Sequence, residues 1–200
     1  MIKKILIWSA VIIAVVIAVF AVIVLMQPDD FRITRSATMA APPEEVFAQV
    51  NDFHKWDAWS PWLALDPNAK NSFAGTTEGE GAIFRWSGND EVGEGNMTII
   101  ESRPSELIRL RLEFTRPMQD VAETTFTFEP ASDQTKVSWI MSGKNEDFIS
   151  KAVCLVMNMD KVVGSKFEEG LAKMKQVVEA TPKENDEGRK PNDESSTKSE

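Results

Sequence analysis

The chain has 200 residues and a mass of 22.3 kDa, which leaves room for one domain with an appendage and not for several domains. Its 31 Asp and Glu residues outnumber its 22 Lys and Arg residues, and the net charge of −9 excludes the basic surface that nucleic-acid binding requires. A single cysteine, Cys154, and a single histidine, His54, exclude an intramolecular disulfide and a Cys/His zinc site. We expect no cofactor and no metal, and we find no catalytic motif.

The N-terminal segment is long and apolar. Ile5–Met26 contains no charged side chain, and as a helix it would be roughly 33 Å long, enough to cross a hydrocarbon core of about 30 Å. A cleaved signal peptide has a shorter apolar region that ends in small residues, whereas this run ends in Leu25, Met26 and Gln27. We therefore predict that residues 1–28 are an uncleaved transmembrane anchor.

The charges on either side of this segment give its predicted orientation. Lys3 and Lys4 lie in a very short N-terminal tail, which favours a cytoplasmic N-terminus, although Arg32 and Arg35 on the far side weaken the asymmetry. We expect a single-pass protein of the inner (cytoplasmic) membrane with its domain on the periplasmic or extracytoplasmic side. At the other end, residues 181–200 contain many charges and no large apolar side chain, so we expect a disordered, solvated tail.

Residues 29–180 are left as one folded domain. Its middle alternates apolar and polar residues between turn signals, which is typical of an antiparallel sheet with one dry face and one wet face. A short helix is predicted at Glu44–Val50, after Pro42 and Pro43. The predicted strands are Phe31–Met39, Asn71–Thr76, Ala82–Ser87, Gly95–Glu101, Leu107–Phe114, Ala122–Phe128 and Lys136–Ser142.

The C-terminal part of this domain has helical periodicity. Phe167, Leu171, Met174 and Val178 form one apolar stripe, and Ser165 with Glu168 suggests a capping box that starts this helix just after Gly164. Phe148–Val163 is apolar on too many sides for a surface helix, so it must be enclosed by the domain or contact lipid or a partner. The fold class is therefore α+β, with a curved sheet wrapped around a long C-terminal helix.

Three sequence stretches resemble the SRPBCC (START-like) superfamily, and more narrowly its membrane-anchored members of the polyketide cyclase/dehydrase type. They are Pro42–Phe47, the Trp-rich turn Val50–Trp62, and Asn158–Gly164 leading into a helix with the pattern Gly164-x-x-Phe167-x-x-Gly170-Leu171. The resemblance implies a helix-grip fold with seven antiparallel strands, two short helices after the first strand, and a hydrophobic cavity under the C-terminal helix. It also implies an apolar ligand such as a lipid, sterol or polyketide, and it transfers no catalytic residue.

Our leading hypothesis is a membrane-anchored domain that binds an apolar small molecule or lipid in this cavity. The alternatives are a cyclase- or dehydratase-like enzyme that uses Arg85 or His54, and a protein-interaction or stress-response domain. The expected partners are the lipid bilayer and the apolar ligand, and the oligomeric state stays open. Candidate cavity-lining residues are Trp59, Trp62, Arg85, Trp86, Phe126, Trp139, Met141, Phe167, Leu171 and Met174.

Most of these candidates also have a plainer interpretation. The tryptophans and the stripe of the last helix are core residues by default, and they would line any cavity that the core leaves. Arg85 lies between Phe84 and Trp86, and it would be a ligand-binding cation only if it faced inward, because an unpaired buried charge is costly. Outward is favoured for Arg85, and a structural role is favoured for His54.

Overall fold

The computed structural model describes residues 2–145 and 147–180, so the predicted tail at 181–200 lies outside the described residues. The helices are α1 (Ile2–Leu25), α2 (Pro43–Asn51), α3 (Phe148–Met157) and α4 (Met159–Ala180), and η1 (Phe53–Ala58) is a 3-10 helix. The strands are β1 (Asp30–Met39), β2 (Lys70–Gly75), β3 (Ala82–Ser87), β4 (Glu94–Arg103), β5 (Leu107–Arg116), β6 (Asp120–Ala131) and β7 (Gln134–Lys144).

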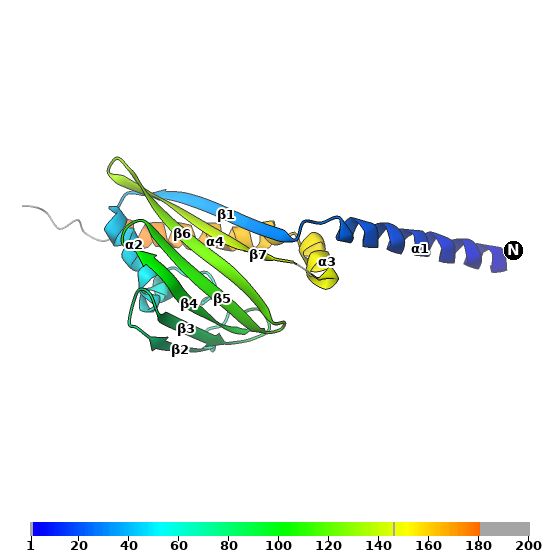
Figure 1. Cartoon of the computed structure of the whole chain (residues 1–200), viewed down its shortest axis with the longest axis horizontal. Coiled ribbons are helices and arrows are strands. Elements are labelled where there is room, and N and C mark those ends of the chain that lie inside the picture. Colours follow the sequence, from blue (N-terminus) through cyan, green and yellow to red (C-terminus); the bar gives the residue numbers. More distant parts are fainter. Residues whose placement is uncertain (1, 146, 181–200) are drawn as a thin grey trace, which may run out of the picture.

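The seven strands form one antiparallel sheet in the order β1-β7-β6-β5-β4-β3-β2. The sheet curves around α4, while α2 and η1 lie at its far end and α1 projects away from the domain on the other side (Figure 1). The predicted fold class is confirmed, including the two short helices after the first strand. We call the end of the domain from which α1 leaves the α1 end.

The alternation of side chains gives the sheet an inner face toward α4 and an outer face toward solvent. In β6, Thr124, Phe126 and Phe128 are buried, whereas Glu123 just before them and Glu129 just after them are exposed. Cross-strand register carries the same face across the sheet, since Phe126 pairs with Ile108 of β5 and with Trp139 of β7. Burial of these apolar side chains against α4 is the main force that closes the domain.

The last helix differs from its predicted start. α4 begins at Met159, where Asn158 adopts a left-handed conformation and its Oδ1 accepts a hydrogen bond from the Lys161 amide at 3.2 Å. The predicted capping box is wrong, because Ser165 lies inside the helix and its hydroxyl donates to the Lys161 carbonyl at 2.7 Å. The apolar stretch Phe148–Val163 is therefore divided between two helices by a sharp turn at Asn158.

The helix α1 is long and apolar enough, by length and composition, to cross a membrane. Its 24 residues have exposed side chains along nearly the whole length, and Val24 in the last turn is the buried exception. The same features fit an N-terminal signal sequence, so the predicted transmembrane anchor remains a prediction at this point.

One ion-pair cluster on α4 should make stability depend weakly on pH. Hydrogen bonds from Lys173 and Lys166 lower the pKa of Glu169 from 4.5 to about 2. A carboxylate with a lowered pKa stabilises the fold fully above its unfolded pKa, and this contribution disappears as the pH falls from about 4.5 toward 2. Because the group is partly exposed, we expect Glu169→Gln to cost under about 1 kcal/mol at pH 7.

Urea unfolding of the full chain in detergent at several pH values measures this effect, because uncharged urea, unlike guanidinium chloride, does not screen the ion pairs. The difference in the free energy of unfolding between the natural chain and Glu169→Gln should shrink as the pH approaches 2. Glu78→Gln, at an exposed carboxylate between β2 and β3, serves as the matched control and should show no such trend. A difference in unfolding free energy for Glu169→Gln that stays constant with pH would contradict the lowered pKa of Glu169.

Candidate functional site

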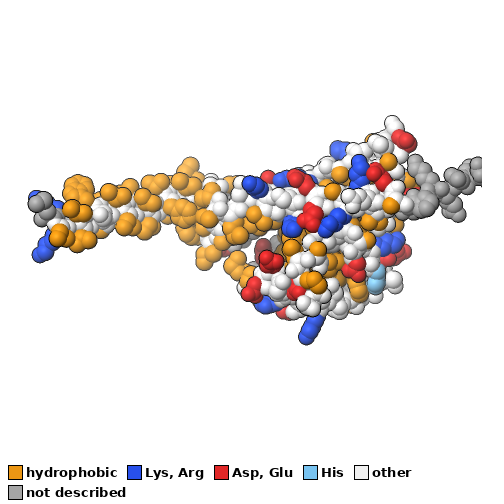
Figure 2. Space-filling model, turned by 180° about the vertical axis from the view of Figure 1, so that it is seen from behind, with side chains coloured by type: hydrophobic (Ala, Val, Ile, Leu, Met, Phe, Trp, Pro, Cys, Tyr) orange, Lys and Arg blue, Asp and Glu red, His pale blue; other side chains and the backbone are white. Residues whose placement is uncertain are grey.

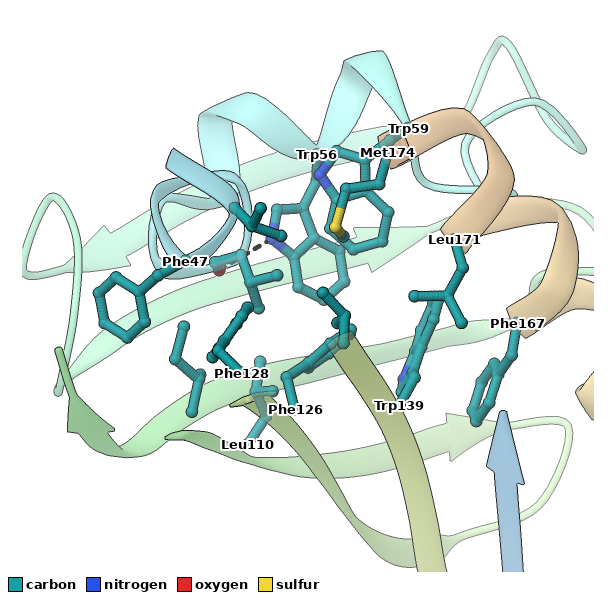
Figure 3. Packing of buried hydrophobic residues seen from close by; sticks show 14 of the residues in the cluster. Phe47, Trp56, Trp59, Leu110, Phe126, Phe128, Trp139, Phe167, Leu171 and Met174 are labelled. Atoms are coloured by element: carbon teal, nitrogen blue, oxygen red, sulfur yellow. Dashed lines mark hydrogen bonds between the residues drawn. The ribbon is translucent and has the colours of Figure 1, made fainter. Parts of the chain in front are cut away.

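The space between α4 and the sheet is occupied by an aromatic cluster (Figure 3). Trp139 of β7 and Phe167 of α4 stack face to face, with ring centroids 4.1 Å apart and planes 7° apart. Trp59, which follows η1, contacts Trp139 and Phe126 edge-on at 5.7 and 6.1 Å. Its indole N–H donates to the Gln49 carbonyl at 3.1 Å, which ties the turn after η1 to α2.

Six predicted cavity residues belong to this cluster or pack beside it, and all six are buried: Trp59, Phe126, Trp139, Phe167, Leu171 and Met174. Two pockets on the described part of the chain lie elsewhere, one on the outer face and one at the α1 end, and none of the six residues lines either of them. In this structure the six residues pack as core.

Three more candidates, Trp62, Trp86 and Met141, are only partly buried where they pack against the core. Trp86 and Met141 lie toward the α1 end of the inner face, together with Met97 and Leu112, which are direct cross-strand neighbours. Phe31 and Met159 are also partly buried apolar residues that pack against the core. We call these two and the four residues above the inner patch: Phe31, Trp86, Met97, Leu112, Met141 and Met159. The inner face thus has a fully buried far half and a less completely covered half near α1.

Arg85, the remaining candidate, does not belong to the interior. The alternation of β3 turns Phe84 and Trp86 inward, so the side chain between them points outward and is exposed. There it lines a surface pocket of about 330 Å³ with mostly polar neighbours, including Lys70, Ser72 and Glu94. Its inclusion among the cavity-lining residues is thereby corrected, and the outward orientation that we favoured is the one observed.

His54 does not belong to the interior either, because it is exposed at the edge of the sheet, over Phe73 of the edge strand β2. Its ring stacks on Phe73 with centroids 4.1 Å apart, and Nδ1 is 2.8 Å from Asp52 Oδ1, whose side chain also accepts from the His54 amide. These contacts describe a structural histidine at the start of η1. Within residues 2–145 and 147–180, no three or more His, Cys, Asp or Glu side chains gather as a metal site would require.

Sequence reasoning did not single out Arg35, which joins the inner face of β1 to α4. Its guanidinium donates to Glu168 at 2.7 Å through Nε, and to both carboxylate oxygens of Asp160 at 3.1 and 3.2 Å. Hydrogen bonding to Arg35 lowers the pKa of the Asp160 carboxyl. Gly164 makes this approach possible, because a Cβ there would overlap the guanidinium. The alternation of β1 placed Arg35 on the apolar face, but only the structure supplies its partners.

The second pocket lies at the junction of α1 with the domain, and we call it the junction pocket. It has a volume of about 310 Å³ and lies between the end of α1, the start of β1, α3 and the start of α4. Phe31 and Met159 belong both to its lining and to the inner patch, and Ile33 in the lining is the cross-strand partner of Met141. The junction pocket therefore continues into the less covered half of the inner face.

The polar side of the junction pocket is held together by an ion pair. Lys151 Nζ of α3 is 2.5 Å from Asp29 Oδ1, and the hydrogen bond and charge of Lys151 lower the pKa of Asp29. Arg32, Asp30 and Asp160 also line this pocket. A lining that contains both apolar side chains and charged groups suits an amphipathic ligand, whose apolar and polar parts need different surroundings.

A curved antiparallel sheet that grips a C-terminal helix over an apolar inner face defines a helix-grip domain of the ligand-binding class. The chain belongs to the family described as "Polyketide cyclase / dehydrase and lipid transport", whose profile matches residues 30–179. The predicted resemblance to the SRPBCC superfamily is confirmed by this match. A comparison with curated proteins finds no significant match.

Solved structures share this fold at low sequence identity. Protein CV1439 from Chromobacterium violaceum is 18% identical with a TM-score of 0.54, covering 76% of this chain and 99% of that one. CalU16 from Micromonospora echinospora is 14% identical with a TM-score of 0.50, covering 76% and 77%. Ara h 8.0201 is 12% identical with a TM-score of 0.54, covering 74% and 97%. At such identities the likeness shows the fold alone.

Proposed function

We propose that this protein is a membrane-anchored binding domain for an apolar small molecule or lipid. The observation that carries the proposal is the junction pocket, which is lined by Gln27 and Pro28, just after the end of α1, and by the apolar inner-face residues Phe31 and Ile33. If α1 spans a bilayer, a ligand leaving that bilayer meets this pocket before any other part of the domain. The family description, which includes lipid transport, supports the same class of ligand.

The inner patch is the proposed place for the apolar part of the ligand. Its side chains are apolar, they are only partly buried, and two of them, Met97 and Met141, are unbranched and adapt to irregular shapes. Covering them would remove apolar surface from water, which is worth about 25 cal/mol per Å² before the costs of association. The fully buried far half of the inner face offers no comparable gain.

Photocrosslinking tests this proposal. The full chain is reconstituted into phosphatidylcholine vesicles that contain palmitic acid with a diazirine in its chain, and crosslinked peptides are mapped by mass spectrometry. We expect crosslinks within the inner patch in addition to those on α1. Met97→Trp should reduce the crosslinks in the patch several-fold, because the larger side chain fills the space that the palmitoyl chain needs.

Ile100→Trp is the matched control, since it makes a similar change at an exposed position of the same strand. It should leave crosslinking in the patch unchanged. Crosslinks confined to α1, with none in β3, β4, β5 or β7, would rule out the proposed binding site. Release of the chain from the vesicles by alkaline carbonate would rule out the proposed anchor.

A further inference from the structure

The short helix α3 has an unusual exposure for a helix with its composition. None of its ten residues is buried, and Ile149 and Val156 are 64% and 70% exposed. Phe148, Leu155 and Met157 are exposed as well. For Phe148–Met157 the alternative that the domain encloses the segment is therefore wrong, and contact with lipid or with a partner remains, whereas Val163 of the same apolar stretch is buried on α4.

The helix is nonetheless well defined by its ends. The Asp147 carboxylate accepts hydrogen bonds from the Ile149 and Ser150 amides, both at 2.9 Å, and Asn158 ends the helix in a left-handed conformation. An isolated helix of this length is marginal in water. The two caps define α3 as a helix although its apolar side chains face outward. Exposure of such side chains to water is unfavourable, so a surface of this kind is typical of an interaction site.

The two sides of α3 have different roles. Lys151, Cys154 and Leu155 line the junction pocket, and Lys151 is fixed to Asp29 by its ion pair. Ile149 and Val156 are seven residues apart, which places them on one side of the helix, and their high exposure shows that this side faces away from the domain. One side thus attaches α3 to the domain, and the other presents Ile149 and Val156 as largely exposed side chains.

The position of α3 indicates what covers this side. α3 contacts α1, and it lies across the axis of α1 at the point where α1 joins the domain (Figure 1). Hydrophobic side chains are spread along α1 and are present again at this junction (Figure 2). Met118 and Val121, in and just after the β5–β6 connection, are 53% and 50% exposed at the same end of the domain.

A helix that lies across a membrane-spanning helix lies along the membrane plane. Interfacial helices of this kind bury their apolar side about 5–10 Å into the boundary between headgroups and acyl chains. Because α1 has 24 residues, at about 1.5 Å per residue it is slightly longer than a hydrocarbon core of about 30 Å, so its last turn and α3 fall near that boundary.

We propose that α3 is an interfacial helix, which inserts Ile149, Val156 and Met157 into the leaflet where α1 ends and so holds the junction pocket against the lipid. The inference rests on the proposed anchorage by α1 and adds a second membrane contact to it. With this contact, a ligand would pass from the leaflet to the inner patch without crossing water, whereas a domain tethered only by α1 would leave a hydrated gap.

A fluorescence experiment on the full chain in phosphatidylcholine vesicles tests the proposal. In a Cys154→Ser background, the variant Val156→Cys is labelled with the environment-sensitive fluorophore NBD, and quenching by lipids with a nitroxide near the headgroup is measured. We expect blue-shifted emission and strong quenching. The control Asp133→Cys, in the turn between β6 and β7 at the far end, should show aqueous emission and little quenching.

A second variant relates this contact to function. Ile149→Asp combined with Val156→Asp should leave the thermal unfolding of the domain unchanged, since both side chains are exposed, while palmitate crosslinking in the inner patch falls several-fold. Aqueous emission at position 156 in chains that resist alkaline carbonate extraction would overturn the interfacial helix and leave the anchor intact. Chains that carbonate releases would overturn the anchor itself.

Discussion

Replacement of Trp59 by alanine is expected to lower the free energy of unfolding by about 3–5 kcal/mol, the range for truncating a buried large aromatic residue. Trp59 is fully buried and contacts Trp56, Phe126 and Trp139. The alanine variant loses these contacts, leaves a cavity at the centre of the cluster, and removes the donor to the Gln49 carbonyl. Because domains are typically stable by only about 5–15 kcal/mol, this one change should bring the fold close to its limit.

Guanidinium unfolding of the full chain in detergent, followed by far-ultraviolet circular dichroism, measures this loss. Trp62→Ala removes the same number of atoms three residues later from a partly buried site, so it should cost clearly less. Trp59→Phe keeps an aromatic ring but not the N–H donor, so its loss of unfolding free energy should lie between those of Trp59→Ala and Trp62→Ala. Equal losses for Trp59→Ala and Trp62→Ala would show that the aromatic cluster is not the centre of the core.

Periodicity was sufficient to predict the strands and the stripe of α4. Alternation in β5 and β6 predicted which side chains face inward and which face outward, because successive side chains of a strand point to opposite faces of the sheet. Both strands have a polar residue at nearly every outer position. The apolar positions Phe167, Leu171, Met174 and Val178 are all buried, since they follow one side of a helix that packs against a sheet.

Contacts between segments that are distant in the sequence could not be predicted from periodicity. The residues of a capping box are present at Ser165 and Glu168, but Glu168 binds Arg35 of β1 instead, and the helix starts earlier, at Met159 after a left-handed Asn158. Neither the Arg35 ion pairs nor the Trp139–Phe167 stack leaves a local signal, because each joins residues more than twenty positions apart. Sequence likewise could not tell whether the aromatic residues would enclose a hollow or fill it.

The two halves of the inner face are expected to serve different properties, one the stability of the fold and the other the proposed binding of a ligand. The far half is closed by the aromatic cluster and by α4, so changes there should act on folding. The half near α1 has partly covered apolar side chains and continues into the junction pocket, so changes there should act on the ligand with a smaller effect on stability. Met97→Trp and Trp59→Ala are thus expected to separate the two properties.

Gly170→Leu is expected to destabilise the domain by about 1–3 kcal/mol or more, because it overpacks the contact between α4 and the core. Gly170 is buried on α4, and a Cβ there would lie 2.9 Å from Pro61 Cδ and 2.9 Å from Trp139 Cζ3. Both neighbours are rings that cannot swing aside as a flexible side chain would. The gain of nearly 1 kcal/mol in helix propensity over glycine offsets only part of this clash.

Ala172→Leu is the matched control, since it adds the same side chain two residues later at an exposed position of the same helix, and its effect should stay within about 0.5 kcal/mol. Gly170→Ala tests more sharply whether a side chain at this position raises or lowers the stability of the domain. If α4 packs as closely on Pro61 and Trp139 as the distances indicate, Gly170→Ala unfolds at a lower guanidinium concentration than the natural chain despite its better helix propensity. A rise in that midpoint would mean that α4 has room to move away from the sheet, and the filled interior described above would then be one of several packings of the same fold.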